Sequence, residues 1–234
     1  MFIRSYARRV REVAWCHERG SAGAQATVTS TMAERLADAA MVVIARDGHD
    51  ALSVRRVARE VSVTGGTVQH YYPTKVELTV AALDRCVARQ SARLRRRPGP
   101  GSEVEQLIRR LGSLLPVGDE RRTEAVVWIA MSAAVSGQPE IEARHRQAVD
   151  GMRRWLQSCI ERAQDCGEVQ RQVDAGEAAQ MIEAGLDGMM LAGIAETRGS
   201  TRQAHNRLGV LVKRVLLIDE DDRRPSKEVQ PGET

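Results

Sequence analysis

One stretch, residues 52–78, constrains the fold more than any other part of the chain, and it reads LSVRRVAREVSVTGGTVQHYYPTKVEL. Ser53 is an N-cap candidate, and apolar residues follow it at helical spacing. A glycine-bearing break comes next, and a second short helix is predicted over 66–71. This helix is expected to end before Pro73, because a proline disfavours helical conformation in the residue that precedes it. A capping box beginning at Thr74 opens a third helix. Two short helices joined by a tight turn indicate a helix-turn-helix.

The second helix of this pair has the polar groups and the dimensions to enter a DNA major groove. Gly65 and Gly66 carry no Cβ, so the backbone can approach a phosphate or a base edge closely. Gln69 is a residue type that can pair with adenine, and His70 can donate to a base or a phosphate. Val68 and Tyr71, three residues apart, are predicted to face inward and hold the helix against its partner. For Tyr71 a DNA contact is the alternative.

The segment VSVTGGTVQHYYPTKVEL resembles the signature of the tetracycline-repressor (TetR) family of bacterial transcriptional regulators. The resemblance implies that Thr64, Thr67 and His70 face DNA. It also implies that Lys75 meets a phosphate and that Tyr72 takes the family's core aromatic position. Gln69 and Gly65 depart from the tyrosine and lysine common in the family. The candidate DNA contacts, including the cap of the first helix, are Ser53, Thr64, Gly65, Gly66, Thr67, Gln69, His70, Tyr71 and Lys75. A helix pair inside an enzyme or a helical adaptor is the alternative to this interpretation.

Positive charge is concentrated in the part of the chain that carries this motif. Residues 1–97 hold 17 Lys and Arg against 9 Asp and Glu, whereas the remaining residues hold 18 against 22. A basic first part is the electrostatic footprint that DNA binding requires. The slightly acidic second part therefore indicates a different task.

The rest of the chain is predicted to be all-α. Further capping boxes begin at Thr31 and Ser102, Asp174 is a further cap, and Pro139 suits a first helical turn. The helix that begins at Thr74 is expected to reach Arg97, after which Pro98–Gly101 marks a domain boundary. His49, in a glycine turn, is expected to face solvent. The predicted units are a basic, disorder-prone extension (1–29), a three-helix DNA-binding domain with its connecting helix (30–97), a helical ligand-binding and dimerisation domain (102–218) and a disordered tail (219–234).

Two surfaces are predicted in the second half. The family resemblance implies a four-helix homodimer interface from residues 175–198 and 201–218, and the small residues near Gly185 would permit close helix packing. Methionine and tryptophan at helical spacing suit an adaptable apolar cavity, although core packing is their commoner role. The candidate cavity residues are Trp128, Met131, Met152, Trp155, Met181 and Met189.

The sequence therefore predicts a homodimeric repressor of an inverted-repeat operator, released by a small apolar or amphipathic ligand. The ligand and the sign of regulation rest on the resemblance alone, and a ligand-independent DNA-binding or architectural protein is the alternative. An enzyme is not expected, because the histidines and cysteines lack metal spacing and no nucleophile motif occurs. No cofactor and no membrane span are expected, and the predicted location is the cytoplasm.

Overall fold

The computed structural model describes residues 31–97, 99–134, 138–196 and 201–217, and all regular elements in these ranges are helical. The all-α prediction is therefore confirmed, while the predictions for residues 1–29 and 219–234 lie outside the described residues. The elements are α2 (Met32–Asp47), the 3₁₀ turn η1 (His49–Ala51), α3 (Val54–Glu60), α4 (Gly65–Tyr71), α5 (Lys75–Leu94), α6 (Glu103–Gly112), α7 (Asp119–Ala134), α8 (Pro139–Asp165), α9 (Ala175–Ala195) and α10 (Thr201–Val215).

Helix starts follow local side-chain chemistry. Reciprocal capping boxes occur at Thr31, Thr74 and Ser102, each with a glutamate three residues later. Asp174 caps α9 by accepting a hydrogen bond from the Glu177 amide at 2.8 Å. These side chains satisfy amides that the helix itself leaves without partners, which is why the starts could be predicted from sequence.

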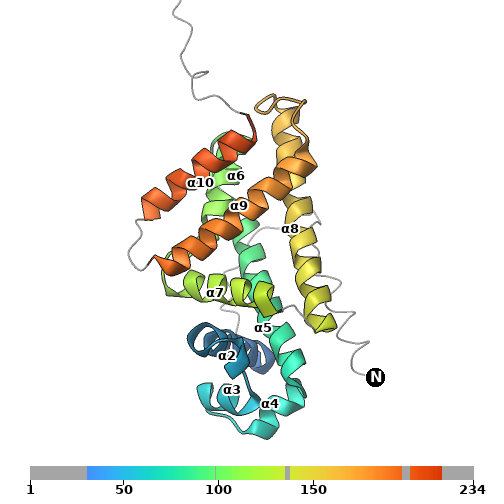
Figure 1. Ribbon diagram of the computed structural model, residues 1–234, viewed down its shortest axis with the longest axis vertical. Helices are drawn as coiled ribbons and strands as arrows, with labels where there is room; N and C mark the ends of the chain where they lie inside the picture. The colour runs from blue at the N-terminus through green and yellow to red at the C-terminus, as the bar shows by residue number, and fades with distance from the viewer. Residues whose placement is uncertain (1–30, 98, 135–137, 197–200, 218–234) are drawn as a thin grey trace, which may run out of the picture.

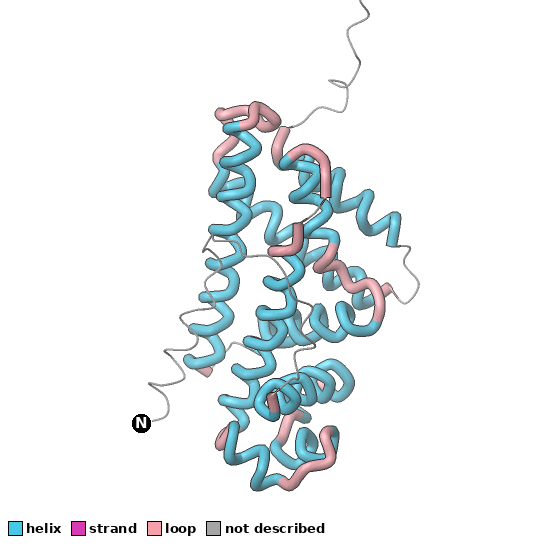
Figure 2. Tube along the Cα trace, turned by 180° about the vertical axis from the view of Figure 1, so that it is seen from behind, coloured by secondary structure: helices cyan, strands magenta, loops and turns pink. Residues whose placement is uncertain are grey.

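The chain forms an elongated molecule with α2, α3 and α4 at one end (Figure 1). Helix α5 leaves this end and runs into the other half, where α7 packs against α2 and α8 extends along one side, at the right in Figure 1. Figure 2 shows the same course of α5 from behind. Helix α5 is therefore the covalent link between the helix-turn-helix and the rest of the molecule, and the packing of α7 on α2 is a second connection.

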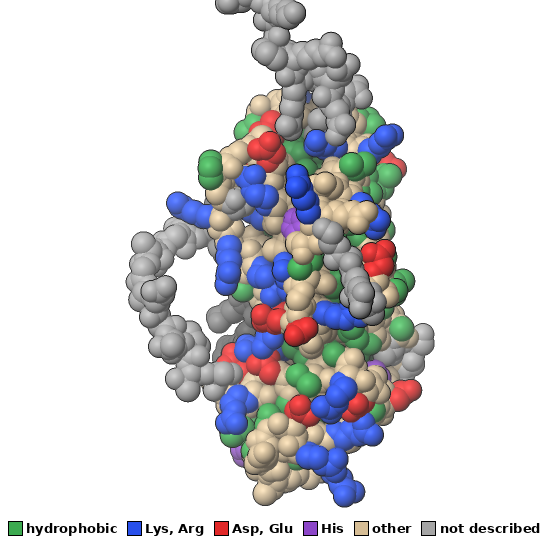
Figure 3. Space-filling view, turned by 90° about the vertical axis from the view of Figure 1, so that its left-hand side faces the viewer, with side chains coloured by type: hydrophobic (Ala, Val, Ile, Leu, Met, Phe, Trp, Pro, Cys, Tyr) green, Lys and Arg blue, Asp and Glu red, His purple; other side chains and the backbone are tan. Residues whose placement is uncertain are grey.

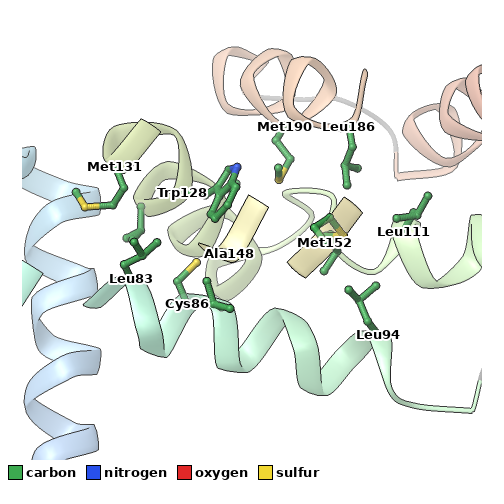
Figure 4. Packing of buried hydrophobic residues seen from close by; sticks show 14 of the residues in the cluster. Leu83, Cys86, Leu94, Leu111, Trp128, Met131, Ala148, Met152, Leu186 and Met190 are labelled. Atoms are coloured by element: carbon green, nitrogen blue, oxygen red, sulfur yellow. The ribbon is translucent and has the colours of Figure 1, made fainter. Parts of the chain in front are cut away.

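One apolar core runs through both halves. It includes Leu36 of α2 at one end and Leu216 beyond α10 at the other. In its middle, Leu83, Cys86 and Leu94 of α5 lie towards side chains of α7, α8 and α9, among them Trp128 (Figure 4). Buried side chains at this density move little without their neighbours, so a displacement of α5 would be felt at both ends.

Some helix boundaries differ from the prediction by a few residues. Helix α5 ends at Leu94 rather than Arg97, and α4 begins at Gly65 rather than Gly66. Arg95, Arg96 and Arg97 are exposed, and clustered like charges add nothing that would extend the last turn. In the described ranges, no helix is both long and apolar enough to cross a membrane.

Candidate DNA interface and regulatory cavity

Helices α3 and α4 are each held by a short cap and a buried apolar side. Ser53 Oγ accepts from the Arg56 amide at 3.4 Å, and Thr64 Oγ1 accepts from the Thr67 amide at 3.1 Å. Val68 of α4 is completely buried, as is Val57 of α3. With one side of α4 fixed in this way, its opposite side is presented outward at the end of the molecule.

The outward side of α4 carries most of the predicted DNA contacts. Thr64, Gly66, Gln69 and His70 are exposed, and Gly65 and Thr67 are half-buried. A Cβ on Gly66 would meet only Thr64 Oγ1 at 3.8 Å, so this surface is open to an approaching molecule. The predicted contact residues are thus brought together on one face.

Tyr71 does not face inward as the three-residue spacing predicted. It is 43% exposed, and its ring makes an edge-on contact with His70, with centroids 5.2 Å apart. Tyr72 is the buried tyrosine, and its hydroxyl donates to the Ala33 carbonyl oxygen at 3.0 Å. The last turn of α4 therefore places Tyr71 on the outward face, where it extends the polar surface with an aromatic ring.

Two exposed arginines on α3 were missed by the motif-based reasoning. Arg55 and Arg59 are exposed, and neither forms an ion pair with any residue that the structure describes. Their neighbour Arg56 differs, since it pairs with Asp47 at 2.8 Å. The signal available in the sequence was the Arg55-Arg56 pair, one residue after the Ser53 cap, which puts Arg55 outward in the first turn of α3.

Lys75 and His49 tie the helix-turn-helix to α5. Lys75 Nζ donates to the Asp50 carbonyl oxygen at 3.0 Å, and Thr79 Oγ1 donates to the Lys75 carbonyl oxygen at 2.8 Å. His49 Nε2 lies 3.2 Å from the same Thr79 oxygen, and only 11% of the His49 side chain is exposed. The expectation that His49 faces solvent is therefore wrong. Burial, with the nearby Lys75 charge, lowers the pKa of His49.

Ion pairs hold α2 against the middle of α5. Asp38 of α2 accepts from Arg85 Nε at 2.7 Å and pairs with Arg89 at 2.9 Å. Arg93, one turn further along α5, pairs with the buried Glu124 of α7. Removing one partner of a buried pair is costly, so the Arg93–Glu124 pair in particular holds α5 against α7, while the half-buried Asp38 pairs add contacts between α2 and α5.

A small cavity of about 20 Å³ lies in the second half, enough for roughly one water molecule. Helices α5, α7, α8 and α9 all line it. Of the predicted cavity residues, Trp128 and Met152 do so. The side chains that surround it include those of Trp128, Met152, Leu186 and Met190 (Figure 4).

The other predicted cavity residues lie elsewhere. Met131 and Trp155 are buried in the common core, and Met189 is half-buried. Met181 is 53% exposed on α9, so the prediction that it faces an interior cavity is wrong. Helical spacing of methionines in the sequence could not distinguish positions that line the cavity from exposed ones, because α9 has apolar residues on its outer side as well.

The polar groups of the cavity, which the sequence could not identify, are two carboxylates, an indole and the Gln90 amide. Trp128 Nε1 donates to Asp187 Oδ1 at 2.9 Å, and Glu183 pairs with Arg153 at 3.0 Å. Burial, with the neighbouring Glu183, raises the pKa of Asp187 to about 6, although the Trp128 hydrogen bond acts in the opposite direction. The His145 ring stacks on Trp128 at 4.8 Å. The cavity thus combines apolar walls with one polar end.

The chain has a helix-turn-helix with an outward polar face, and one helix joins it to a helical half with a small cavity. This architecture is that of the helix-turn-helix transcriptional regulators. Residues 36–82 match the family described as "Bacterial regulatory proteins, tetR family", and residues 103–216 match "BetI-type transcriptional repressor, C-terminal". The chain belongs to the TetR family of transcriptional regulators.

Individual relatives agree with this assignment. The chain is 33% identical over 110 residues to the transcriptional repressor KstR of Rhodococcus jostii. The aligned residues cover 47% of this chain and 52% of that protein. The chain thus spans about half the length of this curated relative. A crystal structure of a transcriptional regulator from Rhodococcus sp. Rha1 superposes with a TM-score of 0.72 at 27% identity, covering 80% of this chain and 97% of that one. The crystal structure of a regulator from Saccharomonospora viridis in complex with choline superposes with a TM-score of 0.67 at 26% identity. This superposition covers 77% of this chain and 95% of that one.

Proposed function

We propose that this chain is a homodimeric transcriptional repressor that binds an inverted-repeat operator through α4 and is released by a small ligand. The observation that carries the proposal is the outward face of α4, where Thr64, Gly66, Gln69 and His70 are exposed together at the end of the molecule. Polar side chains on an exposed second helix can read base edges. Lys and Arg side chains near this end of the molecule add sequence-independent attraction (Figure 3).

The proposed phosphate contacts flank the outward face. Arg55 and Arg59 are exposed on α3, and Lys75 is exposed at the start of α5. Lys75 already donates to the Asp50 carbonyl oxygen, and an ammonium group has three donors, so a phosphate oxygen can be added. These cations position the protein on DNA, whereas the side chains of α4 provide sequence preference.

The proposed dimer surface is the outer side of α9 together with α10. Met181, Ala184, Gly188 and Leu191 are exposed at spacings of three and four residues, so they form one stripe along α9. A Cβ at Gly188 would meet nothing within 4 Å, which leaves room for a helix to approach. Dimerisation is also required by the proposed activity, since two recognition helices must reach half-sites about 34–36 Å apart.

The proposed ligand would enter the cavity and enlarge it. At about 20 Å³ the cavity cannot hold an organic molecule without separating the helices that line it. One of these helices is α5, which contributes Val87 and Gln90 and continues into the helix-turn-helix. A ligand that binds only the enlarged form would shift the population towards a different spacing of the two α4 helices.

A small apolar or amphipathic molecule fits the apolar walls, and Asp187 or Gln90 would meet its polar part. The S. viridis neighbour, whose structure contains choline, supports a small-molecule site in this fold.

The decisive experiment is the selection of random duplex DNA by the purified full-length chain, followed by sequencing of the retained fragments. An inverted repeat is expected. A folded protein that enriches no sequence at any salt concentration would eliminate the proposal. A protein that enriches a repeat but never loses affinity with any added small molecule would favour the ligand-independent alternative.

Two variants divide the proposed contacts by role. His70→Ala should change the preferred sequence, because it alters the face that reads bases. Lys75→Ala should weaken specific and random DNA alike and lower the slope of log affinity against log salt by about one. Titration of both variants against operator and random duplexes at several salt concentrations provides the measurement. Equal losses on both duplexes for both variants would contradict this division.

A further inference from the structure

A second concave site, separate from the cavity, lies where the end of α5, the end of α6 and the start of α7 meet. It has a volume of about 440 Å³, within the usual range for small-molecule sites. Six arginines line it: Arg93, Arg96 and Arg97 from α5 and its C-terminal end, Arg109 and Arg110 from α6, and Arg121 from α7. We call this the arginine hollow.

Carbonyl oxygens help to hold two of these arginines in place. Arg109 Nη2 donates to the Pro100 carbonyl oxygen at 2.7 Å, and Arg121 Nε donates to the Val117 carbonyl oxygen at 2.8 Å. A carbonyl fixes the direction of a guanidinium group but does not neutralise its charge. Both guanidinium groups are therefore partly pre-organised. Arg121, which forms no ion pair with the described residues, also keeps a positive charge that an anion can meet, whereas Arg109 lies beside Glu105.

Carboxylates offset only part of the charge in the arginine hollow. Glu124 pairs with Arg93, Glu105 lies beside Arg109, and Glu120 also lines the hollow. Glu120 is shared, because it pairs on its other side with Arg89 at 3.3 Å. Three carboxylates thus stand against the six arginines of the lining, and an excess of positive charge remains.

Several donors in the arginine hollow have no partner among the described residues. Arg96, Arg97 and Arg110 form no ion pair there. The Nε groups of Arg93 and Arg110 are buried and have no hydrogen-bond acceptor. A buried donor without an acceptor costs free energy, and so does the close approach of like charges. An anion placed between α5, α6 and α7 would relieve both costs.

We propose that the arginine hollow binds a small phosphorylated molecule through its phosphate or pyrophosphate group. Arginine forks match the tetrahedral oxygens of phosphate, and a group with two or three negative charges balances the excess of the lining. The Ser113 side chain also lines the hollow, where its hydroxyl donates to the Arg110 carbonyl oxygen at 2.6 Å. A single carboxylate would leave most of the excess charge uncompensated.

The arginine hollow is too far from α4 to belong to the DNA interface. Arg96 lies 21 residues beyond Lys75, which corresponds to about 30 Å along the helix axis at 1.5 Å per residue. Instead, the hollow joins the end of α5 to α7, and α7 packs on α2 of the DNA-binding half. If the proposed repressor function holds, an anion bound here would change operator affinity, and operator would change anion affinity by the same factor.

The test is calorimetric titration of the full-length chain with inorganic pyrophosphate, and separately with inorganic phosphate, at constant ionic strength and without DNA. Arg96→Gln and Arg110→Gln are combined in one variant, which should fold because neither side chain forms an ion pair with the described residues. Pyrophosphate affinity should fall at least about tenfold in this variant, since two charge-assisted contacts are lost. Arg154→Gln, an exposed arginine of α8 outside the hollow, is the matched control and should bind like the original chain.

Each other outcome counts against the proposal. Equal pyrophosphate affinity in the original chain and the double variant would overturn it. Loss of pyrophosphate binding when sodium chloride provides the same ionic strength would also overturn it, because chloride would then compete as well as a phosphate group. If Arg55→Gln with Lys75→Gln removes pyrophosphate binding while the double variant keeps it, the anion occupies the DNA-binding face. Because no DNA is present, these results are independent of whether an operator is found.

Discussion

At the scale of single residues, Asp187 is a side chain whose surroundings change its acid–base chemistry. It accepts from Trp128 Nε1 in the second half of the molecule, and its pKa is raised to about 6, first by burial and then by Glu183. The folded chain therefore keeps a proton on Asp187 at pH values where the unfolded chain has released it. Because protonation and folding are thermodynamically linked, the contribution of this proton to the free energy of unfolding is fully present below about pH 4. It decreases as pH rises and is lost once pH has passed about 6.

Asp187→Asn should remove this pH dependence. Asparagine keeps a carbonyl oxygen for the Trp128 indole but carries no ionisable group. The variant and the original chain should be about equally stable near pH 4, and the variant should be more stable by about 1–2 kcal/mol near pH 7, after allowance for solvent screening. Urea unfolding at intervals from pH 4 to 8 measures the difference. A difference of the same size at every pH would show that packing, not ionisation, separates the two proteins.

At the scale of elements, local rules predicted more than long-range ones. The starts of α2, α5 and α6 were predictable because a cap and its amide partner lie three residues apart in the sequence. The turn from α4 into α5 was recognised, and the family resemblance placed Tyr72 in the core, as observed, but helical spacing alone could not decide between the two adjacent tyrosines. That choice depends on the carbonyl of Ala33, which accepts from the Tyr72 hydroxyl across 39 residues.

The candidate sites divide in the same way. The outward face of α4 was predictable because one short helix carries all of it. The cavity was not, because its polar end joins Trp128 of α7 to Asp187 of α9, and no periodicity within one helix reports that contact. Likewise the arginine hollow assembles side chains from three helices, while in the sequence Arg95–Arg97 resembles an ordinary charged helix end.

The outer stripe of α9 gives a prediction at this same scale. Gly188→Arg should leave the isolated chain folded, since a side chain there meets nothing within 4 Å. In a dimer built on the stripe, the same guanidinium would be buried without a partner, at a cost of several kcal/mol. The dissociation constant of the dimer should therefore rise by at least about a hundredfold.

Sedimentation equilibrium over a range of protein concentrations measures this shift. Ala143→Arg, an equally drastic change at an exposed position of α8, is the control and should not alter the association. If both variants dimerise as tightly as the original chain, the subunits meet on a different surface.

At the scale of the whole molecule, the two halves share one core and several ion pairs. Leu36 of α2 is completely buried in the core cluster that also contains Trp128 and Trp155. Arg85 and Arg89 tie α5 to α2, and Arg93 ties it to α7. Continuous packing of this kind makes independent unfolding of either half costly, so the chain should unfold as one cooperative unit.

Leu36→Ala tests this, because the change lies in the DNA-binding half and the fluorescent probes lie in the other. Loss of a fully buried leucine should lower the free energy of unfolding by about 2–5 kcal/mol. With Trp15 replaced by Phe, fluorescence reports only Trp128 and Trp155, while circular dichroism reports all helices. Both signals should shift together to lower urea in Leu36→Ala. Val42→Ala, on the same helix but 38% exposed, should shift neither by much. A fluorescence midpoint that stays in place while the dichroism transition splits would show that the halves unfold separately, and α5 could not then transmit strain between the cavity and α4.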